Sequence, residues 1–409
     1  MTQNINANRL FNASCFALIT TAFSFGIRAG ILTQLADGFD LTNTQLGFIN
    51  QMAFLGFPLA MIVFGLLYNV LGPKVIMWTA FVTHMLGILL TIYADGYWTL
   101  LISTFFIGFG NGCTEAACNP MIADSYTGSK MNKMMNRFHM WFPGGIVLGS
   151  LISEFMTNAN LGWQLQMWVI VLPTIIYAFL FWGQNFPAPK AESANLGNNF
   201  KAMLSPLFIF ILACMALTAI SEFGPNQWVG PILSKVGASP MMILVCVTGV
   251  MALGRLFAGP LVHTLDSTTI LLISSILAAT GIYLMSVATG GMVYFAAIIF
   301  AIGVCYFWPT MLGFIAEHTP KTGALGLSIV GGMGMFSTAI FQPVIGNWID
   351  DERSGRNMEA LVGEARDAAE LAAGQATLQN MVLFPAILIV AFTFLFFYMK
   401  SQKNKQQIA

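Results

Sequence analysis

Three charged residues interrupt long apolar runs of this sequence: Arg28, Glu115 and Glu222. A charged side chain inside a hydrocarbon layer is costly unless it faces a partner or water, so each of them is a candidate for a functional site. Two interpretations of Arg28 are open, because it either balances Glu115 in a helix core or anchors a solute. Glu115 is in turn a counter-charge or a proton-binding site, and Glu222 is a structural or a ligand-binding residue.

Polar side chains recur at helical spacing around two of these charges. Asn111 and Asn119 share a helical stripe with Glu115, and Asn226 lies one turn beyond Glu222. Residues three or four apart lie on the same face of a helix. We therefore predict that Asn111, Asn119, Glu222 and Asn226 bind the ligand, together with Arg28.

A helix break and several aromatic residues accompany these groups. Gly224 and Pro225 interrupt the run just after Glu222, and in transporters such breaks release backbone groups for a ligand or a gate. Tyr306 and Trp308 belong to another apolar run and could stack on a sugar ring. Amides combined with aromatic faces suit a polyhydroxylated solute, so both aromatic residues are predicted to bind the ligand.

The composition identifies a membrane protein. Apolar residues make up 57% of the 409 residues, charged residues make up 8%, and the formal net charge is zero. A soluble chain of this length needs a charged surface, and a nucleic-acid-binding protein needs a basic face. The six cysteines lie within apolar stretches without zinc-site spacing, so we expect buried free thiols. No hydrolytic, redox, metal-binding or nucleotide-binding constellation is present, so we expect neither an enzyme nor a cofactor.

Apolar runs of helical length recur along the whole chain. Only helices and closed barrels satisfy their backbone groups in hydrocarbon, and runs of this length are helices. We predict an all-α membrane protein with twelve transmembrane helices, over approximately 12–35, 47–71, 75–93, 98–122, 138–157, 164–186, 204–228, 241–264, 268–287, 291–315, 324–346 and 378–399.

The distribution of lysine and arginine predicts the orientation in the membrane. With the N-terminus inside, eleven of these residues fall in cytoplasmic segments and four fall outside, in agreement with the positive-inside rule. Both termini are then cytoplasmic, in a cell membrane that we expect to be a bacterial inner membrane. The long external loop 350–376 is acidic, and its apolar residues recur at helical spacing from Asn357 to Ala373. We expect a short external helix there that acts as a lid or spacer.

The chain contains an internal repeat. Aligning Gly65 with Gly259 gives an offset of 194, and Ala123-Asp124 falls on Ala316-Glu317 with an offset of 193. This predicts an N-terminal six-helix half over 1–186, a cytoplasmic linker over 187–203 and a C-terminal six-helix half over 204–409. Two parallel halves of this kind are typical of one transporter architecture.

The segment between the second and third runs has the spacing of a known signature. Gly65, Leu67, Asn69, Gly72 and Lys74 resemble the loop signature G-x-L-x-D-x-x-G-x-K of the major facilitator superfamily, with asparagine at the position of the aspartate. Arg255 is similar to the arginine that ends the eighth span in that superfamily. The resemblance covers essentially the whole chain, and it implies the major facilitator fold with spans 1, 4, 7 and 10 around a central cavity.

A narrower resemblance involves residues 115–120. Their sequence E-A-A-C-N-P resembles the E-T-A-A-N-P element of the fucose–galactose–glucose proton symporters, and Tyr306-x-Trp308-Pro309-Thr310 is similar to their Y-P-T element. The resemblance implies proton coupling through Glu115 and a sugar in the cavity. At the position of the family's aspartate in the first span, this chain has Ala29, beside Arg28.

These observations predict a secondary active transporter that works by alternating access. We expect proton-coupled symport of a sugar or sugar derivative, with an acidic derivative included because of Arg28. Glu115 is the expected proton-coupling residue. The expected gating residues are those of the loop signature (Gly65, Asn69, Gly72 and Lys74) together with Asp124, Arg255 and Glu317.

Three alternatives remain open: an organic anion or small-peptide carrier, an efflux pump for apolar compounds, and a transporter-like sensor. The expected partners are a small-molecule solute, a coupling ion with the proton favoured over sodium, and the lipid bilayer, with the chain acting as a monomer. Direct counterflow of labelled solute separates a transporter from a sensor.

Overall fold

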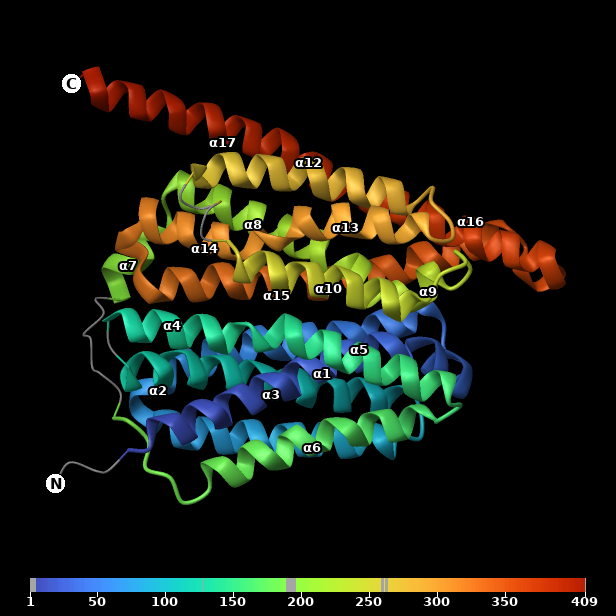
Figure 1. Ribbon diagram of the computed structural model, residues 1–409, viewed down its shortest axis with the longest axis horizontal. Helices are drawn as coiled ribbons and strands as arrows, with labels where there is room; N and C mark the ends of the chain where they lie inside the picture. The colour runs from blue at the N-terminus through green and yellow to red at the C-terminus, as the bar shows by residue number, and fades with distance from the viewer. Residues whose placement is uncertain (1–4, 127, 189–195, 259–260, 262–263, 409) are drawn as a thin grey trace. The chain divides into compact units, whose positions relative to one another are not determined.

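The computed structural model describes residues 5–126, 128–188, 196–258, 261 and 264–408, and the described residues form helices and turns without a β-strand (Figure 1). The chain divides into two compact units, Met1–Ser193 with Ala339–Asn347 and Ala194–Thr338 with Trp348–Ala409. The predicted linker 187–203 includes residues 189–195, and the predicted repeat includes Gly259, Pro260, Val262 and His263. These positions lie outside the described residues, so the predicted domain boundaries stay a prediction.

The first unit contains six of the helices. They are α1 (Ala7–Phe39), α2 (Asn43–Ile92), α3 (Tyr97–Ser125), α4 (Gly128–His139), α5 (Trp141–Asn158) and α6 (Trp163–Phe181).

The second unit contains the other described helices, and the segment Ala339–Asn347 of its longest helix groups with the first unit. They are α7 (Leu196–Met203), α8 (Pro206–Gln227), α9 (Val229–Leu233), α10 (Pro240–Leu256), α12 (Ser267–Met285), α13 (Met292–Cys305), α14 (Phe307–His318), α15 (Gly323–Gly355), α16 (Gly363–Met381) and α17 (Leu383–Ile408), with short 3₁₀ turns at Pro320–Thr322 and Met358–Ala360.

Helix α2 consists of two limbs that meet at Gly72, where φ is 72° and ψ is 160°. Glycine adopts this left-handed backbone without the strain of a Cβ atom. The first limb runs parallel to α3, because Ala53 lies at Gly108 and Phe57 lies at Gly112. The second limb runs the other way, since its residues contact earlier positions of α3 as the chain advances (Met77–Cys118, His84–Asn111 and Thr91–Ser103).

Glycines allow the helices of the first unit to pack closely. A Cβ atom at Gly112 would overlap the carbonyl oxygen of Phe57, and one at Gly108 would overlap that of Ala53. Gly145 and Gly149 of α5 likewise face Ala22 and Phe23 of α1. The glycines at 108, 112, 145 and 149 therefore serve close helix packing.

In the second unit, Ser-Pro pairs start two helices. Ser205 and Ser239 accept hydrogen bonds from the backbone N–H groups of Phe208 and Met242, three residues later. In each case proline follows at the first helical position, where its missing N–H costs nothing. These caps set where α8 and α10 begin, and both helices carry residues of the candidate site.

Eight helical segments among the described residues are long and apolar enough to cross a bilayer, and α10 is a shorter apolar helix. With α2 divided into its two limbs, each predicted apolar run falls on a helix. The chain is therefore an all-α, multi-pass membrane protein, and the count of twelve crossings is consistent with the structure. All six cysteines are free, and five of them are buried, as expected.

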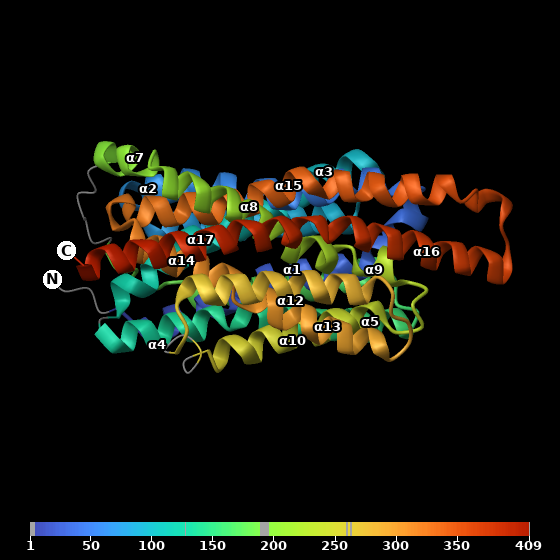
Figure 2. The same cartoon turned by 90° about the horizontal axis from the view of Figure 1, so that it is seen from above.

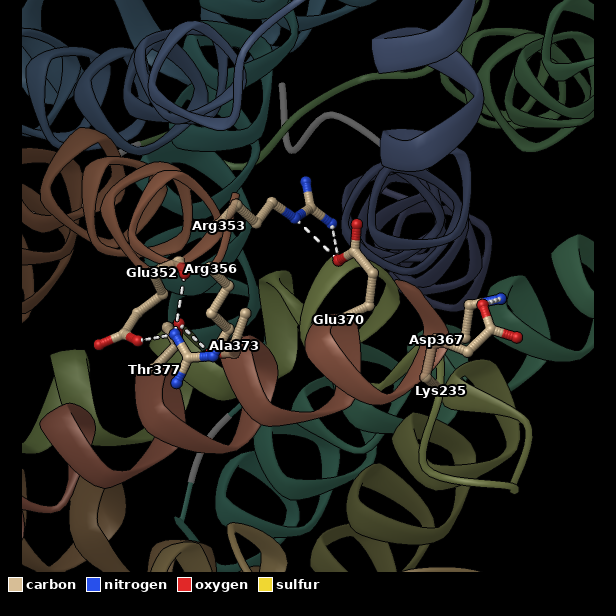
Figure 3. A network of polar contacts seen from close by, with 8 residues as sticks. All are labelled: Lys235, Glu352, Arg353, Arg356, Asp367, Glu370, Ala373 and Thr377. Atoms are coloured by element: carbon tan, nitrogen blue, oxygen red, sulfur yellow. Dashed lines mark hydrogen bonds and ion pairs between the residues drawn. The ribbon is translucent and has the colours of Figure 1, made fainter. Parts of the chain in front are cut away.

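The loop predicted to hold a short helix instead begins as an extension of α15 to Gly355, and α16 starts at Gly363 (Figures 1 and 2). The helix predicted to begin at Asn357 instead begins at Gly363, six residues later, and continues to Met381. Gly363 has a φ of +61°, a backbone conformation that separates α16 from the preceding turn. Ion pairs hold α16 against its neighbours (Figure 3): Arg353 contacts Glu370 at 2.9 Å, and Lys235 contacts Asp367 at 2.7 Å.

Candidate functional site

A chain of buried hydrogen bonds crosses the first unit. Tyr177 of α6 meets His84 Nδ1 at 3.0 Å, and His84 Nε2 meets Asn111 Oδ1 at 3.0 Å. Asn111 Nδ2 then donates to Ser24 Oγ of α1 at 3.0 Å, and Ser24 donates to the carbonyl oxygen of Thr21. The side chains of Tyr177, His84, Asn111 and Ser24 are all buried. This chain links four helical segments through their centres.

The direction of these bonds assigns the proton on His84. Asn111 donates through its amide nitrogen, so its carbonyl oxygen accepts from His84 Nε2–H. In the neutral imidazole, His84 Nδ1 accepts from the Tyr177 hydroxyl. His84 is thus a packed histidine. Asn111 is completely buried and contacts protein groups at both ends, and its predicted ligand contact stays a prediction.

Arg28 lies one turn beyond Ser24 on α1 and is 7% exposed. Its guanidinium carbon stands 5.0 Å from the ring centre of Phe25 and 5.6 Å from that of Phe54. The π faces of these rings attract a cation, and burial strengthens the attraction. The aromatic residues were not identified from the sequence as neighbours of Arg28.

Glu115 lies one turn after Asn111 on α3. It accepts a hydrogen bond of 2.7 Å from Asn119 Nδ2. The carbonyl oxygen of Asn119 is buried without a hydrogen-bond partner among the described residues. The predicted neighbours Glu115 and Asn119 are therefore brought together, and Asn119 Oδ1 remains available to accept a hydrogen bond.

Arg28 and Glu115 do not form an ion pair in the described structure. Helices α1 and α3 are antiparallel, because Asn8 contacts Tyr126 while Ser24 contacts Asn111. Four residues on each helix then separate Arg28 from Glu115 by about 12 Å along the helix axes, from a rise of about 1.5 Å per residue. The pairing proposed as one interpretation of Arg28 is thus absent in this conformation.

A second cluster lies in the second unit. Arg255 of α10 places one terminal guanidinium nitrogen 3.8 Å from Glu222 Oε1 of α8, and the side chains are 28% and 7% exposed. Glu222 is a buried residue within α8, whereas Arg255 lies in the last turn of α10. Sequence analysis assigned Arg255 to a cytoplasmic gate, whereas the structure joins it to a predicted ligand residue.

A proline positions the arginine of this cluster. Pro309 has no N–H group, so the carbonyl oxygen of Cys305, four residues earlier, lacks its usual helical partner. The helix breaks between α13 and α14 at Tyr306, and Arg255 Nε donates to this carbonyl oxygen at 3.1 Å. The Tyr306 hydroxyl donates to the carbonyl oxygen of Gly254 at 2.9 Å. The Cys305 carbonyl was missed in the sequence, although a proline four residues later was the available signal.

The remaining predicted ligand residues take different positions. Asn226 is 8% exposed and lies one turn from Glu222 on α8. The Trp308 ring lies against α15, where it would meet a Cβ atom at Gly334 at 2.9 Å. Both residues belong to the second unit, and Trp308 packs against a helix that also bonds α8 through Ser337 and the carbonyl oxygen of Ala216.

Among the predicted gating residues, Asp124 has a partner that the sequence did not reveal. Tyr68, inside the loop signature, donates a hydrogen bond of 3.1 Å to Asp124 Oδ2 and ties α2 to α3. Glu317 lies 3.9 Å from His318 on its own helix. Gly65, Asn69 and Lys74 are exposed, and Gly72 forms the turn described above.

The family of the chain follows from comparison with known proteins. The model of the Major Facilitator Superfamily matches residues 14–341. The chain belongs to this superfamily. The assignment agrees with the loop signature and the two units, and it makes this chain a membrane transporter rather than an enzyme.

Individual relatives of this superfamily member are distant. It is 23% identical over 169 residues to the myo-inositol transporter 1 of Candida albicans, over 40% of this chain and 30% of that protein. The D-xylose transporter of Levilactobacillus brevis is 21% identical over 39% of this chain and 35% of that protein. The chain thus spans less than two thirds of the curated relatives that it matches.

Similarity to a solved structure extends over nearly the whole chain. A D-xylose–proton symporter superposes with a TM-score of 0.73 at 13% identity, covering 92% of this chain and 97% of the other. At this level of identity, the match establishes the fold alone.

Proposed function

We propose that this transporter carries out proton-coupled symport of a sugar or sugar derivative by alternating access. The observation that carries the proposal is the contact between Glu115 and Asn119. It places a carboxylate beside an amide whose carbonyl oxygen is buried and unused. A titratable group of this kind, on a helix with polar neighbours, suits a proton carrier. Two relatives are named as transporters of myo-inositol and D-xylose, and a structural neighbour is named as a D-xylose–proton symporter. These names support a polyol or sugar as the solute.

The cycle needs Glu115 to exist in two states. An ionised Glu115 accepts from the Asn119 amide, whereas a protonated Glu115 can also donate a hydrogen bond to the Asn119 carbonyl oxygen after a small rotation. Binding a proton would thus change the hydrogen-bond pattern beside the solute without leaving a buried charge. Arg28 supplies the anchor in this proposal, and its two aromatic neighbours hold it in place.

Organic anion transport is the second candidate, and Arg28 is the observation that favours it. A guanidinium recognises a carboxylate with paired N–H donors, and a buried location strengthens the bond. Under this candidate the solute would carry the negative charge that Arg28 recognises.

Uptake into proteoliposomes tests the proposal. The purified protein is reconstituted, and accumulation of labelled D-xylose and myo-inositol is followed with and without an inwardly directed proton gradient. We expect Glu115→Gln to abolish accumulation driven by the gradient while solute exchange continues. The matched control is Glu364→Gln, an exposed carboxylate on α16 that should leave accumulation unchanged. Unaltered accumulation and pH dependence in Glu115→Gln would eliminate Glu115 as the coupling residue.

A further inference from the structure

Arg255 retains most of its hydrogen-bonding capacity. A guanidinium has five N–H donors. In the described part of the chain Arg255 donates through Nε to the Cys305 carbonyl oxygen and also contacts the Cys305 thiol. Its contact with Glu222 is 3.8 Å long, beyond hydrogen-bond distance. By contrast, Arg353 and Arg9 both direct terminal nitrogens at oxygen acceptors within 3.1 Å. Arg255 therefore presents terminal donors that no described protein group satisfies.

Glu222 is the matching acceptor. Its side chain is 7% exposed, and it receives no hydrogen bond from the described residues. A buried carboxylate normally has several hydrogen-bond donors around it, because burial removes its water. The pair thus leaves donors on one side and acceptors on the other unused, at a separation that admits the hydroxyl groups of a ligand.

The backbone holds both groups in position. The Cys305 carbonyl oxygen is available only because Pro309 lacks an N–H group, and it fixes Arg255 through Nε. Gly254 permits the close approach, since a Cβ atom there would lie 2.7 Å from the Cys305 sulfur. The Tyr306 hydroxyl is engaged with Gly254, which leaves the tyrosine ring as an apolar surface beside the pair.

Charge balance indicates the kind of ligand. Helix α16 packs against α8, and two of its carboxylates have partners of their own, since Glu370 pairs with Arg353 and Asp367 pairs with Lys235. Arg255 and Glu222 together are neutral. A neutral solute with neighbouring hydroxyl groups can accept from Arg255 and donate to Glu222, whereas the attraction of Arg255 for an anionic solute would be offset by repulsion from Glu222.

We propose that Arg255 and Glu222 form a hydroxyl-binding site for a neutral polyhydroxylated solute. This inference rests on the proposed function and specifies its substrate class. It also makes Arg255 a ligand residue rather than part of a cytoplasmic gate. The ring of Tyr306 would cover the apolar face of the same solute, as aromatic rings do with sugars.

Binding to purified protein tests the site without transport. The probes are myo-inositol and D-xylose as neutral polyols and D-glucuronate as an acid, each measured by the ligand-dependent rise in melting temperature. We expect the neutral probes to stabilise the wild type. Arg255→Lys and Glu222→Gln should each weaken this binding at least about tenfold, because each removes a hydrogen bond to a charged group.

Matched variants separate binding from folding. Arg356→Lys and Glu352→Gln alter an ion pair at the C-terminal end of α15 and should bind the neutral probes as the wild type does. Glu222→Gln keeps the shape of the side chain, so it gives a result even if Arg255→Lys fails to fold. Pro309→Ala restores an N–H for Cys305 and should weaken binding without removing either charged group.

Each other outcome overturns the proposal. Wild-type affinity in both Arg255→Lys and Glu222→Gln would eliminate the site, and stabilisation by D-glucuronate alone would eliminate the neutral class. Absence of stabilisation by every probe would also contradict it. Glu115→Gln separates a failure of the proposed function from a failure of the Arg255–Glu222 site. If Glu115→Gln uncouples uptake while the Arg255 variants bind normally, the proposed function stands and this inference fails.

Discussion

Asn111 Nδ2 lies 3.0 Å from Ser24 Oγ, and this contact sets the register of α3 against α1. Because the two helices are antiparallel, the residue one turn after Ser24 and the residue one turn after Asn111 are displaced from this contact in opposite directions along the helix axes. Arg28 occupies the first of these positions and Glu115 the second. The register therefore separates two charges that the sequence suggested as partners.

The first prediction concerns the independence of Arg28 and Glu115. We expect the effects of Arg28→Gln and Glu115→Gln on the free energy of unfolding to add within about 0.5 kcal/mol in the double variant, as for residues without shared partners. Denaturation of the four proteins in mixed micelles completes the cycle. A coupling energy well above about 1 kcal/mol would show that the two charges interact.

Features that depend on a single helix could be predicted from the sequence, whereas contacts between helices could not. Apolar runs revealed the helices, since hydrocarbon demands long helical segments. Helical spacing placed Asn119 beside Glu115, because both lie on one helix. Contacts between helices were not accessible, because spacing within one run contains no information about axial register against another. For this reason the pairs Arg255–Glu222 and Tyr68–Asp124 appeared only in the structure.

The second prediction compares two glycines. A Cβ atom at Gly112 would overlap the backbone of Phe57, whereas nothing lies within 4 Å of one at Gly65. We expect Gly112→Ala to destabilise the protein by about 1–3 kcal/mol through overpacking. Gly65→Ala should be neutral or stabilising by up to about 1 kcal/mol, because alanine favours the helix. Thermal unfolding in detergent compares the variants, and equal losses at both positions would contradict the packing described here.

The third prediction concerns orientation in the membrane. The excess of lysine and arginine in one set of segments predicts that the termini and the linker lie in the cytoplasm. A cysteine at Ser354, which is exposed near the end of α15, should react with a membrane-impermeant reagent added to intact cells. A cysteine at Ser193 should react only after the cells are opened. Five of the six native thiols are buried, so background labelling should be low. The reverse pattern would invert the topology.

The last prediction concerns the two ion pairs that hold α16 (Figure 3). Arg353 directs both Nε and a terminal nitrogen at Glu370 Oε2, at 2.9 Å each, and the side chains are 30% and 16% exposed. Lys235 and Asp367 are 42% and 59% exposed, so water screens their attraction. We expect Arg353→Ala to reduce stability by about 1 kcal/mol and to speed hydrogen exchange across Gly363–Met381, because Glu370 loses a charged donor. Lys235→Ala should reduce stability by less than about 0.5 kcal/mol and leave this exchange nearly unchanged. Hydrogen exchange by mass spectrometry measures both variants under the same conditions. Similar protection of α16 in wild type and Arg353→Ala would show that its helical packing against α9 and α12, rather than the Arg353–Glu370 pair, holds it in place.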